Sequence, residues 1–310
     1  MTRSPVILGL DFGGTKIAMA ICDQSGNRVA DTVLATEAEA GAASAFERAI
    51  TAARDLLLTA APGAELIAVA AATFGIPFED RVELAPAIPG WESLRFGHEL
   101  RAAFPDVLLC MATDVKAAAL AEVRWGALAG ADPAIYLNLG TGLATAIVAG
   151  GKVVNGAHGA AGEIGYNLRE PADVGRPNSE RLTLEDVVSG KALAEIARAE
   201  LGRRLSTAEL FDLAETDEAA ARIVEAFIRE LAQHVVNLAV AVDPARIAVG
   251  GGLARSWNVL APVLRGALDA AVPYPPELVL AAFPFDAPLI GALALGVEAA
   301  AAVLGEGALR

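Results

Sequence analysis

The most constraining feature of this chain is an apolar strand that enters a glycine-rich turn and returns as a second apolar strand. It occupies Ile7–Ile21, and its turn reads Asp-Phe-Gly-Gly-Thr-Lys. Adjacent Gly13 and Gly14 permit positive φ and let other atoms approach the backbone closely. The N–H groups of the turn and the Thr15 hydroxyl can then form a concave anion site. Taken alone, the pattern is equally that of a simple β-hairpin with a Gly-Gly turn.

Two charged side chains flank this turn. Asp11 stands at the end of the first strand, where a carboxylate can reach a hydrated Mg²⁺, a cation that prefers oxygen ligands. Lys16 begins the return strand, where it can either reach a phosphate or lie on the surface of the strand. We therefore take Asp11 as the candidate metal contact, through water, and Lys16 as a candidate phosphate contact.

A partial copy of this stretch begins the second half of the chain. Over Ile135–Val148 a strand again enters a Gly/Thr turn and returns. Alignment of the two turns places Asn138 opposite Asp11, and Gly140-Thr141-Gly142 opposite Gly13-Gly14-Thr15. Two such halves indicate a duplicated α/β architecture with a cleft between the halves.

A third glycine motif follows a short apolar strand near the end of the chain. Ile247–Val249 runs into Gly250, Gly251 and Gly252, and a helix follows. A strand end with bare backbone before a helix N-terminus is a natural place for the edge of a nucleotide. We expect these three glycines to contact a nucleotide.

The length of the chain, 310 residues, is sufficient for two domains with sizeable cores. We place an N-terminal α/β domain at residues 1–130 and a C-terminal α/β domain at 131–289, because Gly130–Pro133 is the best candidate boundary. A C-terminal helix within 290–310 is a candidate to complete the first domain.

Hydrophobic periodicity and turn signals place the remaining elements. The expected strands are Val29–Leu34, Leu66–Thr73, Val82–Leu84, Val107–Ala112 and Leu278–Ala281. The expected helices are Ala38–Leu58, Phe96–Ala103, Val115–Leu128, Leu182–Glu200, Ser206–Ala214, Asp217–Val242 and Gly291–Leu304.

Composition restricts the partners and the compartment. With 24 basic and 38 acidic residues the net charge is −14, so nucleic-acid binding, which needs clustered Lys and Arg, is not expected. No apolar run reaches membrane-spanning length, and the first strand begins too early for a signal peptide or an N-terminal DNA-binding domain. Cys22 and Cys110 lie in apolar strand-like contexts, as the buried thiols of a cytoplasmic protein would.

One aspartate has the position of a catalytic base. Phosphoryl transfer to an alcohol needs a phosphate cradle, a metal and a base near the attacking hydroxyl. Asp114 follows the strand Val107–Ala112 and precedes a helix, so its carboxylate can project from the strand end. The alternative is that Asp114 only caps the helix, which is a common use of Asp.

Four motifs in this order resemble the ROK family, which comprises repressors, open reading frames and sugar kinases within the actin/hexokinase-like ATPase superfamily. They are Leu10–Lys16, Leu139–Gly142, His158–Gly165 and Val249–Leu253. The resemblance implies a two-domain actin-like ATPase (ribonuclease H-like) α/β fold with an interdomain cleft. It also implies a homodimer that uses ATP and Mg²⁺ and binds a small sugar-like substrate.

The resemblance assigns roles to three acidic residues. Asp114 would take the proton from the sugar hydroxyl, and Glu163 would accept hydrogen bonds from the sugar. Glu185 resembles a second sugar-contacting Glu, although an acid favoured by the dipole in the first turn of a helix would look the same. His158 is interpreted as a structural histidine.

The chain departs from the family pattern at a metal site. Many members carry a zinc knot made of one His and three Cys. Here Tyr166 replaces the His, and Pro171–Thr183 contains no cysteine. Pro, Asn and Thr cannot replace thiolates in a tetrahedral site, so we expect no structural zinc.

The expected sugar pocket departs as well. Phe78, Ala87, Thr113 and Tyr166 stand where the family usually has Gly, Asn, Asn and His. Each lost hydrogen bond would cost about 1–3 kcal/mol if polar groups of the substrate stayed unpaired. We therefore expect these four residues to line a pocket for an acceptor other than plain glucose.

Two functions are compatible with these residues. The first is an ATP- and Mg²⁺-dependent kinase of a sugar or sugar-like polyol, with Asp114 as the base; the second is a ligand sensor that keeps the fold without turnover. Retention of Asp11 and Asp114 favours the kinase, and the altered sugar contacts favour the sensor. The acidic charge and the early first strand disfavour DNA-binding repression.

Overall fold

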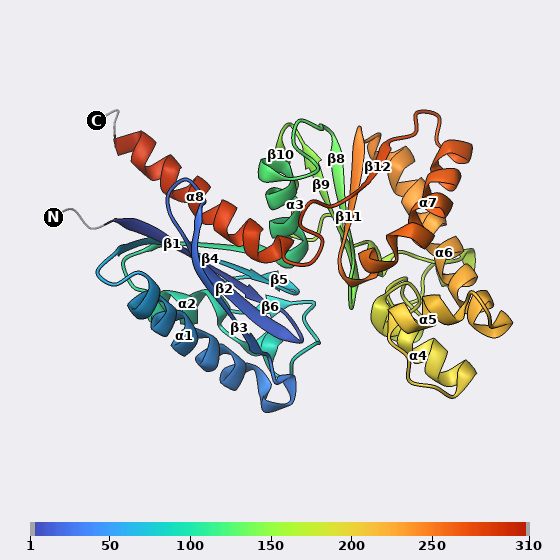
Figure 1. The fold of residues 1–310 in the computed structure, drawn as a ribbon, viewed down its shortest axis with the longest axis horizontal. Helices are drawn as coiled ribbons and strands as arrows, with labels where there is room; N and C mark the ends of the chain where they lie inside the picture. Colours follow the sequence, from blue (N-terminus) through green and yellow to red (C-terminus); the bar gives the residue numbers. More distant parts are fainter. Residues whose placement is uncertain (1–3, 308–310) are drawn as a thin grey trace. The chain divides into compact units, whose positions relative to one another are not determined.

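The computed structural model describes residues 4–307, with side chains described as far as residue 303. The chain divides into two compact units (Figure 1). The first unit comprises the described residues up to Arg124 together with those from Asp286 onward, and the second unit is Trp125–Phe285. The first unit is therefore discontinuous in sequence.

The first unit is built on a five-stranded sheet in the order β3-β2-β1-β4-β7. Three consecutive strands form an antiparallel meander, and the other two run parallel to β1. The strands are β1 (Pro5–Phe12), β2 (Lys16–Cys22), β3 (Arg28–Ala35), β4 (Glu65–Thr73) and β7 (Leu108–Thr113). β1 and β4 are buried along most of their length, which explains their near-continuous apolar sequence.

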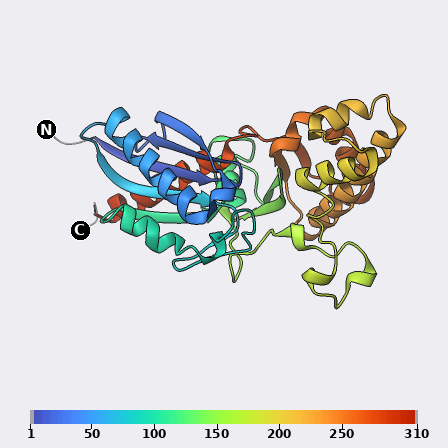
Figure 2. The same cartoon turned by 90° about the horizontal axis from the view of Figure 1, so that it is seen from below.

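Helices cover both faces of this sheet (Figures 1 and 2). They are α1 (Gly41–Ala60), α2 (Phe96–Ala103), α3 (Asp114–Trp125) and α8 (Ala287–Gly307). α1 and α2 share one face, where the rings of Phe12 and Phe46 stack with their centroids 5.8 Å apart. α3 and α8 share the other face, against small residues such as Ala70 and Ala72.

α8 approaches α3 so closely that one position admits only glycine. A Cβ on Gly291 would lie 1.7 Å from the carbonyl oxygen of Ala117. Because no carbon and oxygen atoms pack at that distance, any side chain at Gly291 would push the two helices apart. α3 begins with Asp114, so the helix that carries the candidate base is the one that packs against Gly291.

The second unit repeats the same sheet topology, in the order β10-β9-β8-β11-β12. Three antiparallel strands are again followed by two parallel ones. The strands are β8 (Ala134–Leu139), β9 (Leu143–Ala149), β10 (Lys152–Val153), β11 (Arg246–Gly250) and β12 (Glu277–Leu280). The helices are α4 (Gly190–Leu201), α5 (Thr207–Leu213), α6 (Glu218–Val242) and α7 (Trp257–Ala271). The duplicated α/β fold predicted from the partial sequence repeat is confirmed.

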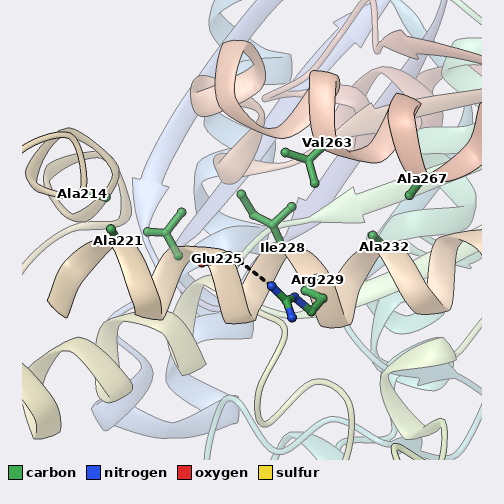
Figure 3. Close-up of a pocket in the computed structure, with 9 residues that line it drawn as sticks. Ala214, Ala221, Glu225, Ile228, Arg229, Ala232, Val263 and Ala267 are labelled. Atoms are coloured by element: carbon green, nitrogen blue, oxygen red, sulfur yellow. Dashed lines mark hydrogen bonds and ion pairs between the residues drawn. The ribbon is translucent and has the colours of Figure 1, made fainter. Parts of the chain in front are cut away.

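The helices of the second unit form one large core with the sheet, centred on residues such as Leu137, Leu231 and Leu264. A groove between α6 and α7 is lined mainly by small apolar side chains (Figure 3). An ion pair between Glu225 and Arg229, one helical turn apart, lies along it. None of the lining residues belongs to a glycine motif, so we do not place a substrate there.

The predicted helix over Leu182–Glu200 is wrong in its first part. α4 begins at Gly190, and the hydroxyl of Ser189 caps it by accepting a hydrogen bond from Ala192 N–H at 3.1 Å. Leu184 and Val188 have helical spacing and are fully buried, but in a non-helical segment that packs into the core. Glu185 therefore does not lie in the first turn of a helix.

Short elements complete the fold. β5 (Ile76–Pro77) pairs with β6 (Val82–Glu83) in a small hairpin. The 3₁₀ helices are η1 (Ala38–Ala40), η2 (Trp91–Ser93), η3 (Ile164–Tyr166), η4 (Pro171–Asp173), η5 (Asn178–Glu180) and η6 (Gly252–Ser256). Both cysteines are free thiols, and burial raises the pKa of Cys22 to about 12. Within residues 4–307, no helix combines the length and apolarity that crossing a bilayer requires.

Candidate active site

The first glycine turn is closed by its own backbone. Gly13 N–H donates to the carbonyl of Lys16 at 3.0 Å, and a Cβ on Gly13 would lie 2.8 Å from that oxygen. The N–H groups of Gly14 and Thr15 have no acceptor among the residues that the structure describes. These two donors are therefore the part of the turn that can hold an anion.

Thr36, at the end of β3, supports this turn and was not predicted from the sequence. Its hydroxyl donates to the carbonyl of Gly13 at 2.6 Å, and its N–H donates to the carbonyl of Thr15 at 2.9 Å. Thr36 itself is fully buried, so its two hydrogen bonds tie the exposed turn to the interior of the first unit. The link spans 23 residues, and no local sequence signal marks it.

Asp11 is almost completely buried and lies near a second carboxylate. Burial, followed by the negative charge of Asp114, raises the pKa of Asp11 to about 7, against the opposing charge of Lys16. Asp286 adds a smaller effect in the same direction. A bound cation would favour the ionised form of such a carboxylate.

This donor set fits a magnesium ion that keeps part of its water shell. Among the described residues, no three His, Cys, Asp or Glu side chains gather closely enough to enclose a metal. Mg²⁺ usually binds through one or two carboxylates, with waters and substrate phosphates completing its octahedron. Asp11, at the edge of the phosphate turn, is in the right place for one such contact.

Asp114 lies where β7 ends and α3 begins. Its Oδ1 accepts the N–H of Val115 at 2.7 Å, whereas the hydroxyl of Thr113 accepts the N–H of Lys116 at 3.3 Å. The cap of α3 is thus shared, and the buried Thr113 supplies the bond to the third N–H. The helix has a cap other than Asp114, which leaves a second role open to that carboxylate.

Two predicted acceptor residues lie on loops of the first unit. The methyl of Ala87 is 3.5 Å from the position that a Cβ on Gly14 would occupy, so Ala87 lies against the phosphate turn. Its loop is anchored by the buried Trp91, whose indole N–H donates to the Thr73 hydroxyl at 3.1 Å. Phe78 lies at the β5–β6 hairpin, with the Arg81 guanidinium 4.4 Å from the centre of its ring.

The second glycine turn is shaped by Glu185. The Oε2 atom accepts the N–H of Leu143 at 2.7 Å, and a Cβ on Gly142 would lie 2.5 Å from the same oxygen. Although the residue as a whole is exposed, its carboxylate is turned inward, and burial raises its pKa. Glu185 therefore supports the turn that follows Gly140, whatever else it contacts.

The start of α4 also docks on this turn. Gly190 N–H donates to the carbonyl of Gly140 at 2.9 Å, and Lys191 N–H donates to that of Thr141 at 3.2 Å. A Cβ on Gly190 would lie 2.7 Å from the Gly140 oxygen, which explains the glycine. Gly140, Thr141 and Gly142 are thus held from two sides.

Gly250, the last residue of β11, and the two glycines that follow it are needed for different reasons. A Cβ on Gly250 would lie 2.2 Å from the Tyr136 hydroxyl, and one on Gly251 would lie 2.4 Å from the carbonyl oxygen of Leu139. Gly251 also has φ of +89°, which favours glycine. No atom lies within 4 Å of the Cβ position of Gly252, so this is the glycine that faces open space.

Asn138 touches both turns of the second unit and was not among the predicted site residues. Its Oδ1 lies 2.8 Å from the Cβ position of Gly251, and its Nδ2 lies 3.2 Å from that of Gly140. The alignment of Asn138 with Asp11 in the two repeats was the signal that could have identified it.

The loop that carries Glu163 and Tyr166 is anchored on β9. The carbonyl of Gly162 accepts both the N–H and the hydroxyl of Thr145, at 2.8 and 2.9 Å. Gly162 has φ of +89°, and a Cβ there would lie 2.0 Å from the Thr145 carbonyl oxygen. Tyr166 is 36% exposed, and His158 lies on the surface.

Comparisons with known proteins agree with this arrangement. The model of the ROK family matches residues 7–299. Kanosamine kinase of Amycolatopsis mediterranei is 30% identical over 268 residues, which are 86% of this chain and 86% of that protein. A solved ROK hexokinase from Thermus thermophilus has 30% identity and a TM-score of 0.78, covering 95% of this chain and 99% of the other.

A solved ROK glucokinase from Streptomyces griseus, in complex with glucose and AMPPNP, has 26% identity and a TM-score of 0.75, covering 94% of this chain and 99% of the other. The fold is thus the actin-like ATPase fold of these kinases. With a family match over nearly its whole length, the chain belongs to the ROK family.

Proposed function

We propose that this chain is a kinase that transfers the γ-phosphoryl group of ATP to a hydroxyl of a sugar or sugar-like polyol. The observation that carries the proposal is that Asp11 and Asp114 lie at the same end of the first sheet. Asp11 of β1 is level with Ala72 of β4, which is level with Ala112 of β7, and Asp114 follows directly after β7. The negative charge of Asp114 accordingly acts on the buried Asp11. A base next to a metal-binding carboxylate and a phosphate turn meets the basic needs of phosphoryl transfer to an alcohol. Membership of a family that includes sugar kinases supports the same reaction.

Each candidate residue of the first unit has a separate role in this proposal. Asp114 accepts the proton of the attacking hydroxyl, while Asp11 holds Mg²⁺ through water. The N–H groups of Gly14 and Thr15 bind phosphate oxygens, and Lys16 adds positive charge beside them. When bound, Mg²⁺ neutralises charge on the phosphates and orients them.

The residues of the second unit bind the nucleotide. Gly140, Thr141 and Gly142 form the second phosphate turn, and Gly252 offers open backbone to the adenosine, with Gly250 and Gly251 shaping that loop. The Streptomyces griseus relative was solved with AMPPNP, which supports ATP as the donor here.

The acceptor is contacted by six residues in this proposal: Phe78, Ala87, Thr113, Glu163, Tyr166 and Glu185. Of these, Thr113 has its hydroxyl engaged with the Lys116 N–H, and Phe78 is covered by Arg81. Thr113 can still donate its hydroxyl proton, but neither Thr113 nor Ala87 offers the amide group that the family usually has at these two positions. We therefore favour an acceptor other than plain glucose. A relative named kanosamine kinase supports this choice, because its name shows that acceptors other than glucose occur among related proteins.

A panel of acceptors tests both parts of the proposal. Release of ADP is measured with glucose, kanosamine, N-acetylmannosamine, fructose and a nucleoside, each with ATP and Mg²⁺. We expect turnover with at least one sugar, and a higher kcat/KM for a sugar other than glucose. If glucose were the best acceptor, the proposed preference for another sugar would be wrong, while the proposed kinase activity would stand. Sugar binding without ADP release would instead favour the ligand sensor.

We further propose that the protein is a cytoplasmic homodimer without zinc. Cys22 and Cys110 are free thiols, which suits a reducing compartment. The homodimer is proposed by analogy with the family, and light scattering on the eluted protein tests it.

A further inference from the structure

We propose that Arg181 is a positioning residue for the acceptor site. Its guanidinium holds the loop that carries Glu163 and Tyr166 in the conformation that binds the sugar. The inference rests on the proposed function, because it takes these two side chains as acceptor contacts.

The Arg181 guanidinium binds three acceptors at once. Nη2 donates to the carbonyl of Tyr166 at 2.8 Å and to Oδ1 of Asn178 at 2.5 Å, while Nη1 donates to the carbonyl of Asn167 at 3.2 Å. The two carbonyls belong to consecutive residues, 15 and 14 positions before Arg181. A planar fork of donors suits two neighbouring carbonyls, so Arg181 fixes the direction of the peptide that follows Tyr166.

The loop needs such a contact because it has little secondary structure of its own. Within it lies only η3, whose three residues form a single turn with poor hydrogen-bond geometry. On its inner side, Gly162 is bound to Thr145, and the carbonyl of Gly165 accepts the N–H of Glu185 at 3.0 Å. Arg181 adds a further hydrogen bond to the backbone of the next residue, Tyr166.

Contacts with α6 hold the residues that follow. Asn167 Nδ2 lies 3.4 Å from Nδ1 of the buried His234, and Arg169 Nη2 donates to Glu230 Oε2 at 2.9 Å. The Arg169 Nε donates to the other carboxylate oxygen, so the pair is bidentate. Arg181 thus binds the chain between the contact of Gly162 with β9 and the contacts of Asn167 and Arg169 with α6.

Arg176 provides a matched control in the same segment, whose loops project from the second unit in Figure 2. Its guanidinium donates to the carbonyl of Glu180 and pairs with Asp173 at 3.9 Å. None of these partners belongs to residues 162–167. Removal of Arg176 therefore removes the same charge and a similar backbone contact without releasing the acceptor loop.

The test compares Arg181→Ala, Arg181→Lys and Arg176→Ala with the wild type. Amide hydrogen exchange of peptides covering residues 160–168 is measured first, since it needs no turnover. Steady-state kinetics follow with ATP and with glucose, kanosamine and N-acetylmannosamine as acceptors. Arg181→Ala should speed exchange in this peptide and raise the acceptor KM roughly 10- to 100-fold, as loss of a charged hydrogen-bond donor implies. The KM for ATP should change by less than about twofold.

The other two variants distinguish positioning from general support. Arg181→Lys should recover part of the acceptor KM, because an ammonium can reach one carbonyl but lacks the fork. Arg176→Ala should keep the wild-type exchange and KM. The proposal is overturned if Arg181→Ala matches Arg176→Ala, or if it raises the KM for ATP and for the acceptor equally. A wild type without turnover would reject the proposed function, and the exchange data would still decide whether Arg181 holds the loop.

Discussion

The carboxylate of Glu185 accepts a hydrogen bond from the backbone N–H of Leu143 at 2.7 Å. The same oxygen occupies the space that a side chain on Gly142 would need. A residue more than 40 positions away thus supports the glycine turn of Gly140–Gly142 and joins it to the loop before α4.

Gly142→Ala tests this relationship. The new methyl would push the carboxylate away and leave Leu143 N–H without its acceptor, so we expect binding of AMPPNP to weaken about tenfold by calorimetry. Gly266→Ala is the control, because nothing lies near its Cβ position and alanine favours its helix, α7.

A double mutant makes the test specific. Glu185→Ala removes the carboxylate that the new methyl would meet. Gly142→Ala should therefore be less harmful in the Glu185→Ala background than in the wild type, a coupling that two independent sites would lack. Additive effects would show that the two residues do not share this contact.

Asp114→Asn should keep the fold and nucleotide binding but lower turnover by roughly 10²–10⁴, the usual contribution of a positioned base. The amide can still accept the Val115 N–H, so α3 keeps its first turn. Asp106→Asn is a suitable control, since its φ of +61° suits asparagine. Turnover of Asp114→Asn within a few-fold of the wild type would remove Asp114 from the role of base.

The purified protein should contain no stoichiometric zinc. The loop from Tyr166 to Thr183 contains no cysteine, and hydrogen bonds within the protein hold it: Arg181 donates to the Tyr166 carbonyl, and the Asp173 carboxylate accepts Arg169 N–H at 3.0 Å. Elemental analysis should find less than about one zinc per ten chains, and a chelator should leave the melting temperature unchanged. One tightly bound zinc per chain would refute this reading of the loop.

The stability of the protein should fall in mild acid because of His234. This side chain is buried on α6, its Nε2 has no hydrogen-bond partner among the described residues, and burial lowers its pKa. The unfolded chain therefore takes up the proton first. The contribution of neutral His234 to the free energy of unfolding is complete above the pKa of a histidine in the unfolded chain, about 6.5. This contribution falls as the pH drops below that value and is lost once the pH has passed through the lower pKa of the folded state.

His234→Gln measures this contribution. Denaturant unfolding at pH 7.5 and pH 5 should show a smaller loss of stability for His234→Gln than for the wild type. His98→Gln is the control, because the His98 side chain is 49% exposed. Equal losses in all three proteins would assign the acid sensitivity to other groups.

Local pattern was enough to predict much of the fold. The apolar–turn–apolar stretches became β1–β2 and β8–β9, and α6 was placed within one residue because Asp217 caps its start. Such signals work because capping, turns and periodicity depend on residues near one another in the chain.

Contacts between distant segments could not be predicted in this way. The spacing of Leu184 and Val188 mimicked a helix, whereas the Glu185 N–H is bound to Gly165, and its carboxylate to Leu143. Thr36 supports a glycine turn through the folded sheet, where no sequence spacing marks it. Asn138 lies against two glycine turns, and only its alignment with Asp11 in the sequence repeat pointed to it. The site residues were thus suggested by their own motifs, but the groups that hold them were visible only in the fold.

The close contact between Gly291 and Ala117 has a consequence for the order of folding during synthesis. α8 covers the face of the first sheet that holds Ile7 and Ala68, yet it leaves the ribosome after the whole second unit, Trp125–Phe285. The second unit is continuous in sequence and can complete its core first. The N-terminal strands must keep the part of this face that α8 covers exposed until α8 has been made. The half of the protein that is made first is therefore the half that completes its core last.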